Sequence, residues 1–177
     1  MTVHHAVIDL VSHGGTPSFL SVTDQVRQVV DDSGITDGLC TVMTPHTTCS
    51  VYFDEYADDE FDDGTDYLQY DMNQALARIA PDQRAFPPAD GYHYPGEGHF
   101  TEVESWPSAA EFLTGGDRSQ LLNADAHIKS SVVGTSQSFQ VADGALNFGV
   151  TGSVFFVDWD RARSRRRKCL VTVIGDQ

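Results

Sequence analysis

The segment from Asn123 to Gly134 constrains the fold and chemistry of this chain more than any other stretch. Its final glycine is typical of a helix C-terminus. At helical spacing, His127 shares a face with Asn123, Ser130 and Ser131. Beside this polar face we expect an apolar stripe to dock on a sheet, formed by Ala124, Ile128 and Val132. The segment is therefore either one wall of a site or a capped surface helix with one exposed histidine.

Short strand and helix patterns fill the rest of the chain. Strand patterns occur at 3–10, 19–22, 39–44, 49–54, 135–141, 145–150, 153–159 and 168–174. Helical spacing follows Asp24 until Gly34 and continues at 68–79 until Pro81, and a capping-box pattern at Ser108 predicts a short third helix. We expect an Asp143-Gly144 hairpin turn. We also expect strands 153–159 and 168–174 to pair around their arginine-rich connection.

These patterns predict an α+β fold, with an antiparallel-rich sheet packed against two or three helices. No repeat or linker divides the chain, so residues 1–177 are expected to form a single domain. Residues 81–107 are rich in proline, glycine and aromatics and are predicted to be a long loop insertion. Such a loop is usually functional or part of an interface.

Composition excludes several classes of protein. The net charge of −15, with Lys129 and Lys168 as the only lysines, argues against nucleic-acid binding and suits a high-salt cytoplasm. No apolar run is long enough to span a membrane, and no signal peptide is visible, so we expect a cytoplasmic protein without membrane association. Cys40, Cys49 and Cys169 are odd in number and lack a CxxC pair, which favours reduced thiols.

Three histidines from separate segments are candidate metal ligands: His46 at a strand end, His99 in the loop and His127 on the helix. No tight ligand spacing supports the set, and each ring is otherwise a hydrogen-bonded structural group. The sequence does not decide whether His99 or His93 is the loop ligand. Cys49 is more consistent with a small buried thiol than with a nucleophile.

Charged groups supply the other candidates. Glu55 and Asp58 follow the His46 region and suit either orientation of a histidine or proton transfer. Successive side chains of a strand point to opposite faces. In a strand, Arg166 would therefore lie on one face, and Arg161, Arg163, Arg165 and Arg167 would lie on the other. This cluster suits phosphate binding or a subunit interface.

Several segments resemble, in order, the YjbQ-like family, which is also the secondary thiamine-phosphate synthase family. They are His46-Thr47-Thr48-Cys49-Ser50, Asp54-Glu55 with Asp58, Asp71-Met72, residues 123–136, the closing arginine pair and residues 171–175. The resemblance implies a compact α+β homotrimer. It also implies a pocket in which His46, His99 and His127 hold a divalent metal, for which we predict zinc. The implied activity joins a pyrimidine diphosphate to a thiazole phosphate and releases pyrophosphate.

On this basis the first hypothesis is a metal-dependent transferase that acts on a small phosphorylated metabolite. His127 would be catalytic, with Asp58 or Glu55 handling a proton. The phosphate ligands would be Lys129, Ser130, Ser131, Arg163 and Arg166. The alternatives are a non-enzymatic trimer that binds a metal or phosphometabolite, and a metal-dependent phosphoester hydrolase.

Two departures from the family bear on these hypotheses. The family's Trp-Gln pair after the glycine that matches Gly149 is absent, because Val150-Thr151-Gly152 follows here, so stacking of a pyrimidine ring is in question. Tyr56 replaces a common asparagine, and residues 81–122 are longer than in compact members and are expected to reshape the site.

The acidic composition predicts salt-dependent stability. Screening of charge repulsion strengthens as the Debye length falls from about 10 Å at 0.1 M to about 3 Å at 1 M salt. We therefore expect the thermal unfolding midpoint to rise from low to molar potassium chloride. A midpoint that stays level in calorimetry would remove the high-salt interpretation.

Overall fold

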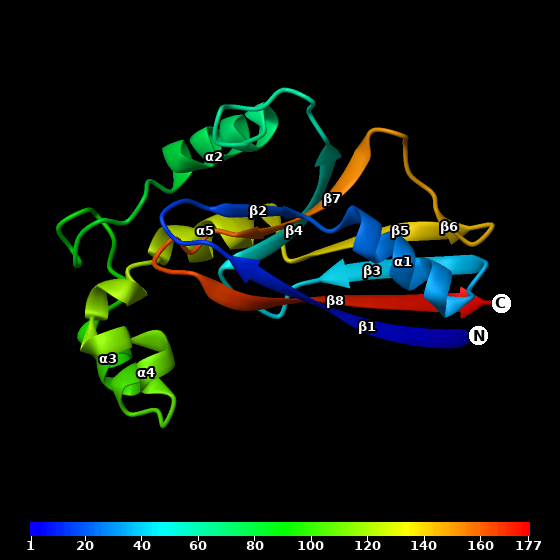
Figure 1. The fold of residues 1–177 in the computed structure, drawn as a ribbon. Helices are drawn as coiled ribbons and strands as arrows, with labels where there is room; N and C mark the ends of the chain where they lie inside the picture. Colours follow the sequence, from blue (N-terminus) through cyan, green and yellow to red (C-terminus); the bar gives the residue numbers. More distant parts are fainter.

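Two antiparallel sheets pack face to face in the computed structural model, which describes residues 1–177 (Figure 1). The larger sheet has the spatial order β1 (Thr2–Ser12), β8 (Arg165–Asp176), β3 (Asp37–Met43), β5 (Ser136–Ala142), β6 (Ala145–Leu146). The smaller has the order β2 (Ser18–Ser21), β7 (Gly152–Asp158), β4 (Cys49–Glu55). Every pairing is antiparallel, which confirms the predicted fold class.

Five α-helices accompany the sheets: α1 (Thr23–Ser33), α2 (Tyr67–Ile79), α3 (Glu97–Glu104), α4 (Ala109–Phe112) and α5 (Ala124–Val133). Gly34 ends α1 in the left-handed conformation at φ 63°, as its position predicted. Asp66 begins α2 by accepting the Leu68 and Gln69 amides at 2.7 and 3.2 Å. None of the helices combines the length and apolar character that crossing a bilayer requires.

The main core lies between the two sheets, where strand alternation turns apolar side chains inward. The facing strands β3, β8, β4 and β7 supply most of it, and α1 closes one end with Val26 and Val30. All three cysteines are free and buried in this core. A second cluster covers the other face of the small sheet, where α2 and α5 pack against Phe155, Val157 and Trp159. Three helices thus pack against the sheets, as predicted.

Helix α5 docks through a different face from the predicted one. Ile128 and Val132, expected to face a sheet, are 40 and 56% exposed. Ala124 is buried as predicted, and the other buried residues are Asp125, Ala126, Lys129 and Ser130. Ser130 Oγ donates to the carbonyl of Cys49 at 2.6 Å. Lys129 and Asp125 form an ion pair with each other. Polar groups that find partners can be buried, so apolar spacing alone gave the wrong face.

The predicted pairing of the last two strands is also wrong. β7 pairs with β2 and β4, whereas β8 pairs with β1 and β3, so residues 159–164 carry the chain from one sheet to the other. The predicted hairpin at Asp143-Gly144 is present, with φ of 52° and 75° at the two turn residues, although β6 is only two residues long.

The region predicted to be a long loop contains helix α3. Together with α4 and the following turn it forms a small hydrophobic cluster of its own, made by Phe100, Val103, Leu113 and Leu121. Figure 1 shows α3 and α4 lying beyond one end of the sheets. Ser108 precedes α4 as expected, but its side chain makes no capping hydrogen bond.

The outer face of the large sheet has no cover within the chain. Val3, Val7 and Leu39 on this face are 49, 54 and 52% exposed. They lie close together, because Val3 and Leu39 both pair with Ile174 of β8. Exposed apolar groups in such a row mark a surface suited to association.

One buried ion pair joins the two sheets. Arg167 of β8 donates from Nε to Oδ2 of Asp158 at 2.6 Å and from Nη2 to Oδ1 at 3.0 Å, and Asp158 ends β7. Both side chains are almost completely buried. The parallel pair of charge-assisted bonds fixes the two sheets at this end.

Removing one member of this pair should be costly. Arg167→Met leaves the Asp158 carboxylate buried without its partner, and we expect a loss of about 3–5 kcal/mol in unfolding free energy by urea denaturation. The matched control is Arg166→Met, on the exposed face of the same strand, with an expected change within about 0.5 kcal/mol. Equal losses in the two variants would contradict the bridging role.

Candidate functional site

Three histidines from distant segments line one cavity of about 260 Å³, named here the histidine cavity. His46 comes from the β3–β4 connection, His99 from α3 and His127 from α5. His93 does not line this cavity, so His99 is the loop histidine that meets the other two. The sandwich supplies one wall, and the α3–α4 region supplies the other, including Tyr94, Trp106 and Phe112.

Backbone contacts hold His46. Its Nε2 accepts the amide of Lys168 in β8 at 2.9 Å, and its own amide donates to Thr44 Oγ1 at 3.1 Å. A neutral imidazole that accepts at Nε2 carries its proton on Nδ1. Partial burial lowers the pKa of His46, and the Arg167 charge lowers it further. His46 is therefore a neutral ring at pH 7.

His127 and His99 meet around Tyr94. The Tyr94 hydroxyl lies 2.9 Å from Nε2 of His99, and its ring meets that of His127 edge-on with centroids 5.4 Å apart. Burial lowers the pKa of His127, opposed by the nearby Asp160 carboxylate. Burial also raises the pKa of Tyr94. His127 and Tyr94 are therefore uncharged at neutral pH.

Two arginines complete the polar wall. Arg167 is held by Asp158 and also reaches Thr48 Oγ1 at 3.3 Å. Arg165 Nη2 lies 2.8 Å from Asp160 Oδ2, an ion pair whose angles are not those of a hydrogen bond. The Nε of Arg165 is buried without a hydrogen-bond partner, whereas Nη2 is engaged by the Asp160 carboxylate. Buried donors without an acceptor are unfavourable, so a ligand that accepts them would be stabilised.

The arrangement does not fit the predicted metal. No group of three histidine, cysteine, aspartate or glutamate side chains lies close enough to hold an ion. His46 already uses Nε2 for the Lys168 amide, and His99 Nε2 contacts the Tyr94 hydroxyl. We therefore derive no chemical step through a metal, and the zinc expectation stays a prediction.

Several predicted phosphate ligands have internal partners. Lys129 is buried with its Nζ 3.2 Å from Asp82 and 3.5 Å from Asp125. Ser130 bonds to Cys49, and Ser131 Oγ donates to the carbonyl of His127 at 2.9 Å. None of the three lines the histidine cavity. Their local partners give them structural roles in this arrangement.

The two predicted arginines also lie elsewhere. Arg163 holds the α4 region by donating to Gln120 Oε1 at 2.8 Å and to the carbonyls of Phe112 and Glu111. Arg166 is exposed on the other face of β8. The predicted alternation holds only from Arg165 onward, because β8 begins there and Arg161 and Arg163 lie in the connection before it. Arg165 and Arg167 are the arginines that line the histidine cavity.

The predicted carboxylates, Glu55 and Asp58, lie far in space from the histidine cavity. Glu55 ends β4 and Asp58 follows it, both exposed, whereas the His46 side of the cavity lies before the start of β4. A seven-residue strand spans about 20 Å, which separates these carboxylates from the cavity. Cys49 is a buried core thiol whose pKa is raised by burial, as expected of a structural cysteine.

Sequence reasoning missed residues that position or line the cavity. Asn123 lines it, but was noted only as a helix-face neighbour of His127. Gln83 is buried and donates to the carbonyl of Tyr94 at 2.7 Å while accepting the Ala124 amide at 2.9 Å. Gln83 thereby holds the segment that contains Tyr94 against the start of α5. No local pattern marks such a residue, because its partners are far apart along the chain.

The lowered histidine pKa values predict a pH effect on stability. Between 6.5 and the lower folded-state values, the unfolded chain binds more protons than the folded chain, so stability falls as pH drops through this range. We expect His127→Gln to flatten this part of the urea-unfolding profile. The exposed His13→Gln control should retain the wild-type slope. A slope unchanged in His127→Gln would contradict a neutral, half-buried ring at this position.

The sequence matches one known protein family over nearly its whole length. Residues 9–176 match the family described as UPF0047 protein YjbQ-like. A UPF0047 protein of Methanocaldococcus jannaschii is 27% identical over 158 residues, covering 89% of this chain and 86% of the relative. The UPF0047 protein YugU of Bacillus subtilis is 26% identical over 156 residues, covering 88% of this chain and 89% of the relative.

Solved structures show the same fold. A YbjQ-like protein of unknown function from Sulfolobus solfataricus P2 superposes with a TM-score of 0.62 at 23% identity, covering 99% of this chain and 100% of that one. A hypothetical protein from Aeropyrum pernix K1 gives a TM-score of 0.64 at 19% identity, covering 97 and 99%. The match over nearly the whole sequence and the shared fold lead to one conclusion: this chain belongs to the UPF0047 family of YjbQ-like proteins.

Proposed function

We propose that the histidine cavity binds the phosphate of a small metabolite and that the protein is a transferase of the thiamine-phosphate synthase type. The observation that carries the proposal is Arg165, a residue of the cavity wall whose Nε is buried without a hydrogen-bond partner. A phosphate oxygen is an acceptor that suits a guanidinium well.

The charge of the wall supports anion binding. The chain has 26 acidic residues and a net charge of −15, yet no aspartate or glutamate lines the histidine cavity. Its charged lining groups are Arg165 and Arg167. The carboxylates of Asp158 and Asp160 lie against these arginines and hold them in place. An anion therefore meets cations and neutral donors first, which is favourable in a partly dry cavity.

The proposed reaction needs stabilisation of a leaving anion. The carbon–oxygen bond to pyrophosphate breaks, pyrophosphate keeps the electron pair, and the thiazole nitrogen bonds to the released carbon. Arg165 would bind the charge that develops on the leaving oxygens. Neutral His127 and the Tyr94 hydroxyl would donate hydrogen bonds. This arrangement assigns no role to Glu55 or Asp58.

An aromatic surface is available for a substrate ring. Trp106, Phe112 and Tyr94 line the histidine cavity, whereas none of residues 149–152, where the family's Trp-Gln pair is absent, does so. Aromatic side chains favour stacked or edge-on contacts with planar rings. The α3–α4 region thus compensates in this chain for the missing aromatic residue.

The second candidate function is phosphometabolite binding without catalysis. The observation that favours it is the absence of a carboxylate base from the cavity lining.

For either function we propose a cytoplasmic homotrimer. The exposed apolar row on the large sheet around Val3, Val7 and Leu39 supports association of copies of the chain.

The test of the proposed function is product formation from the pyrimidine diphosphate and thiazole phosphate, measured by chromatography. We expect thiamine phosphate from the wild-type protein, and a decrease of about 10²-fold in kcat/KM for Arg165→Gln because a leaving-group contact is lost. Arg166→Gln, on the exposed face of the same strand, should retain wild-type rates.

Two results would contradict this proposal. Equal rates in the Arg165→Gln and Arg166→Gln variants would remove the role of the cavity arginine. Binding of both precursors without product would favour the non-catalytic candidate. Assays with a chelator test the metal separately: activity lost with the chelator and restored by zinc would show that the reaction requires a metal ion.

A further inference from the structure

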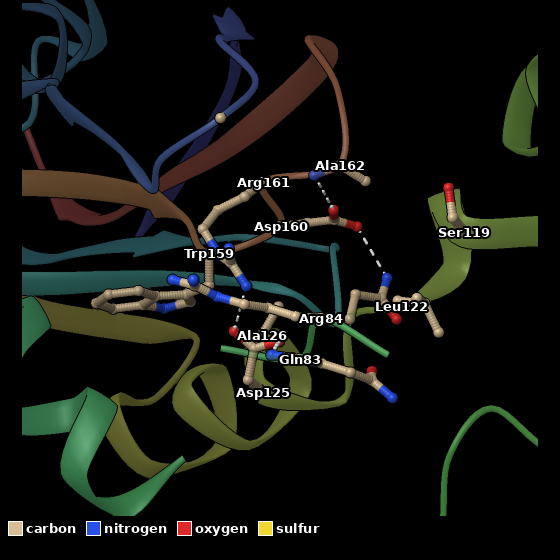
Figure 2. A pocket seen from close by; sticks show the side chains of 12 residues that line it. Gln83, Arg84, Ser119, Leu122, Asp125, Ala126, Trp159, Asp160, Arg161 and Ala162 are labelled. Carbon is tan, nitrogen blue, oxygen red and sulfur yellow. Dashed lines mark hydrogen bonds and ion pairs between the residues drawn. The ribbon is translucent and has the colours of Figure 1, made fainter. Parts of the chain in front are cut away.

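A second cavity, of about 240 Å³, lies on the other side of Asn123 from the histidine cavity. Asn123 is the one residue that lines both cavities. Figure 2 shows the second cavity with Asp125 and Gln83 on one side and Asp160 and Arg161 on the other. The proposed function above makes no use of it.

Asn123 has an unused acceptor. The residue is only 7% exposed, and its Nδ2 donates to Asp160 Oδ2 at 2.8 Å. Its Oδ1 is buried and has no hydrogen-bond partner. A buried carbonyl oxygen without a donor costs free energy, which a ligand hydroxyl could recover.

Arg161 has an unused donor at the same cavity. Its Nη1 lies 3.3 Å from Asp82 and its Nη2 lies 3.2 Å from Asp125, so both ends of the guanidinium have carboxylate partners. The remaining nitrogen, Nε, is buried without a partner. The orientation fixed by the two ion pairs leaves this N–H available to an acceptor.

The charged residues that line the second cavity are two cations, Arg84 and Arg161, and two carboxylates, Asp125 and Asp160. The carboxylate oxygens are already engaged, because Asp125 Oδ1 accepts the Gln83 amide and Asp160 Oδ1 accepts the Ala162 amide.

Arg84 is the more exposed of the two lining cations. Its side chain is 80% exposed, and its one carboxylate contact, to Asp82, is long at 3.5 Å. An exposed pair of this length contributes little, so Arg84 can turn towards an anion at small cost. It lines the same cavity as Arg161.

We propose that the second cavity binds a phosphate-type oxyanion that keeps one hydroxyl group, such as hydrogen phosphate or a phosphate monoester. Arg161 Nε and Arg84 donate to its oxygens, and its hydroxyl donates to Asn123 Oδ1. The site is separate from the histidine cavity and does not require the proposed transferase activity.

The test uses the side-chain N–H signal of Arg161 in ¹H–¹⁵N spectra of the full chain, titrated with inorganic phosphate at neutral pH. Arg161→Lys, which keeps the charge, assigns the signal by its disappearance. We expect a saturable shift with phosphate. Arg84→Gln should weaken this binding about tenfold, and the control Arg78→Gln, exposed on α2, should leave it unchanged.

Sulfate tests the role of Asn123. At neutral pH sulfate has the same shape and charge as hydrogen phosphate but no hydroxyl, so Asn123 Oδ1 would stay unpaired beside it. We expect sulfate to bind at least tenfold more weakly, since a site with an unpaired buried polar group rejects such an analogue. Equal affinities for the two anions would overturn the assignment of the hydroxyl.

Phosphate binding at the second cavity can be distinguished from phosphate binding at the histidine cavity. His99→Gln changes the histidine cavity alone, and we expect the Arg161 signal to respond to phosphate as in the wild type. An Arg161 signal that does not move with phosphate, or that moves equally in Arg84→Gln, would overturn the second site. Neither result bears on product formation by the Arg165→Gln variant.

Discussion

The buried pair of Arg167 and Asp158 couples the two sheets at the end where the histidine cavity lies. Charges taken out of water are costly, and this pair is stabilised by two parallel hydrogen bonds. Fixing Arg167 also fixes its neighbours in β8. Arg165 lies two residues before it on the same face, and the Lys168 amide, which holds the His46 ring, follows it. Much of the cavity wall therefore depends on one ion pair.

The placement of charge explains how an acidic protein presents a basic cavity. The carboxylates nearest the cavity lie behind the arginines and take part in ion pairs with them. The imidazoles of His46 and His127 are neutral because burial lowers their pKa values. The wall thus consists of donors whose charge is partly balanced. Such a wall suits the anion that we propose as its ligand.

Helix α5 separates two polar environments at its start. His127 faces the histidine cavity, whereas Asp125 lines the second cavity and Asn123 lies between the two. Lys129 and Asp125 join Asp82 and Arg161 in a network that ties the helix to the Tyr94 loop and to the β7–β8 connection. The polar side of α5 is buried because these partners come from elsewhere in the chain.

Local patterns by themselves determined the strands, most helices, the Gly34 stop and the Asp143-Gly144 turn, since each depends on side-chain periodicity or on a backbone conformation that suits few residues. The meeting of His46, His99 and His127 came from resemblance rather than from spacing. Only the tertiary structure decided that β7 and β8 belong to different sheets, that α5 buries Lys129 and that Arg165 rather than Arg163 lines the cavity. Periodicity states which side chains share a face, but the partner of that face is set by contacts between residues distant along the chain.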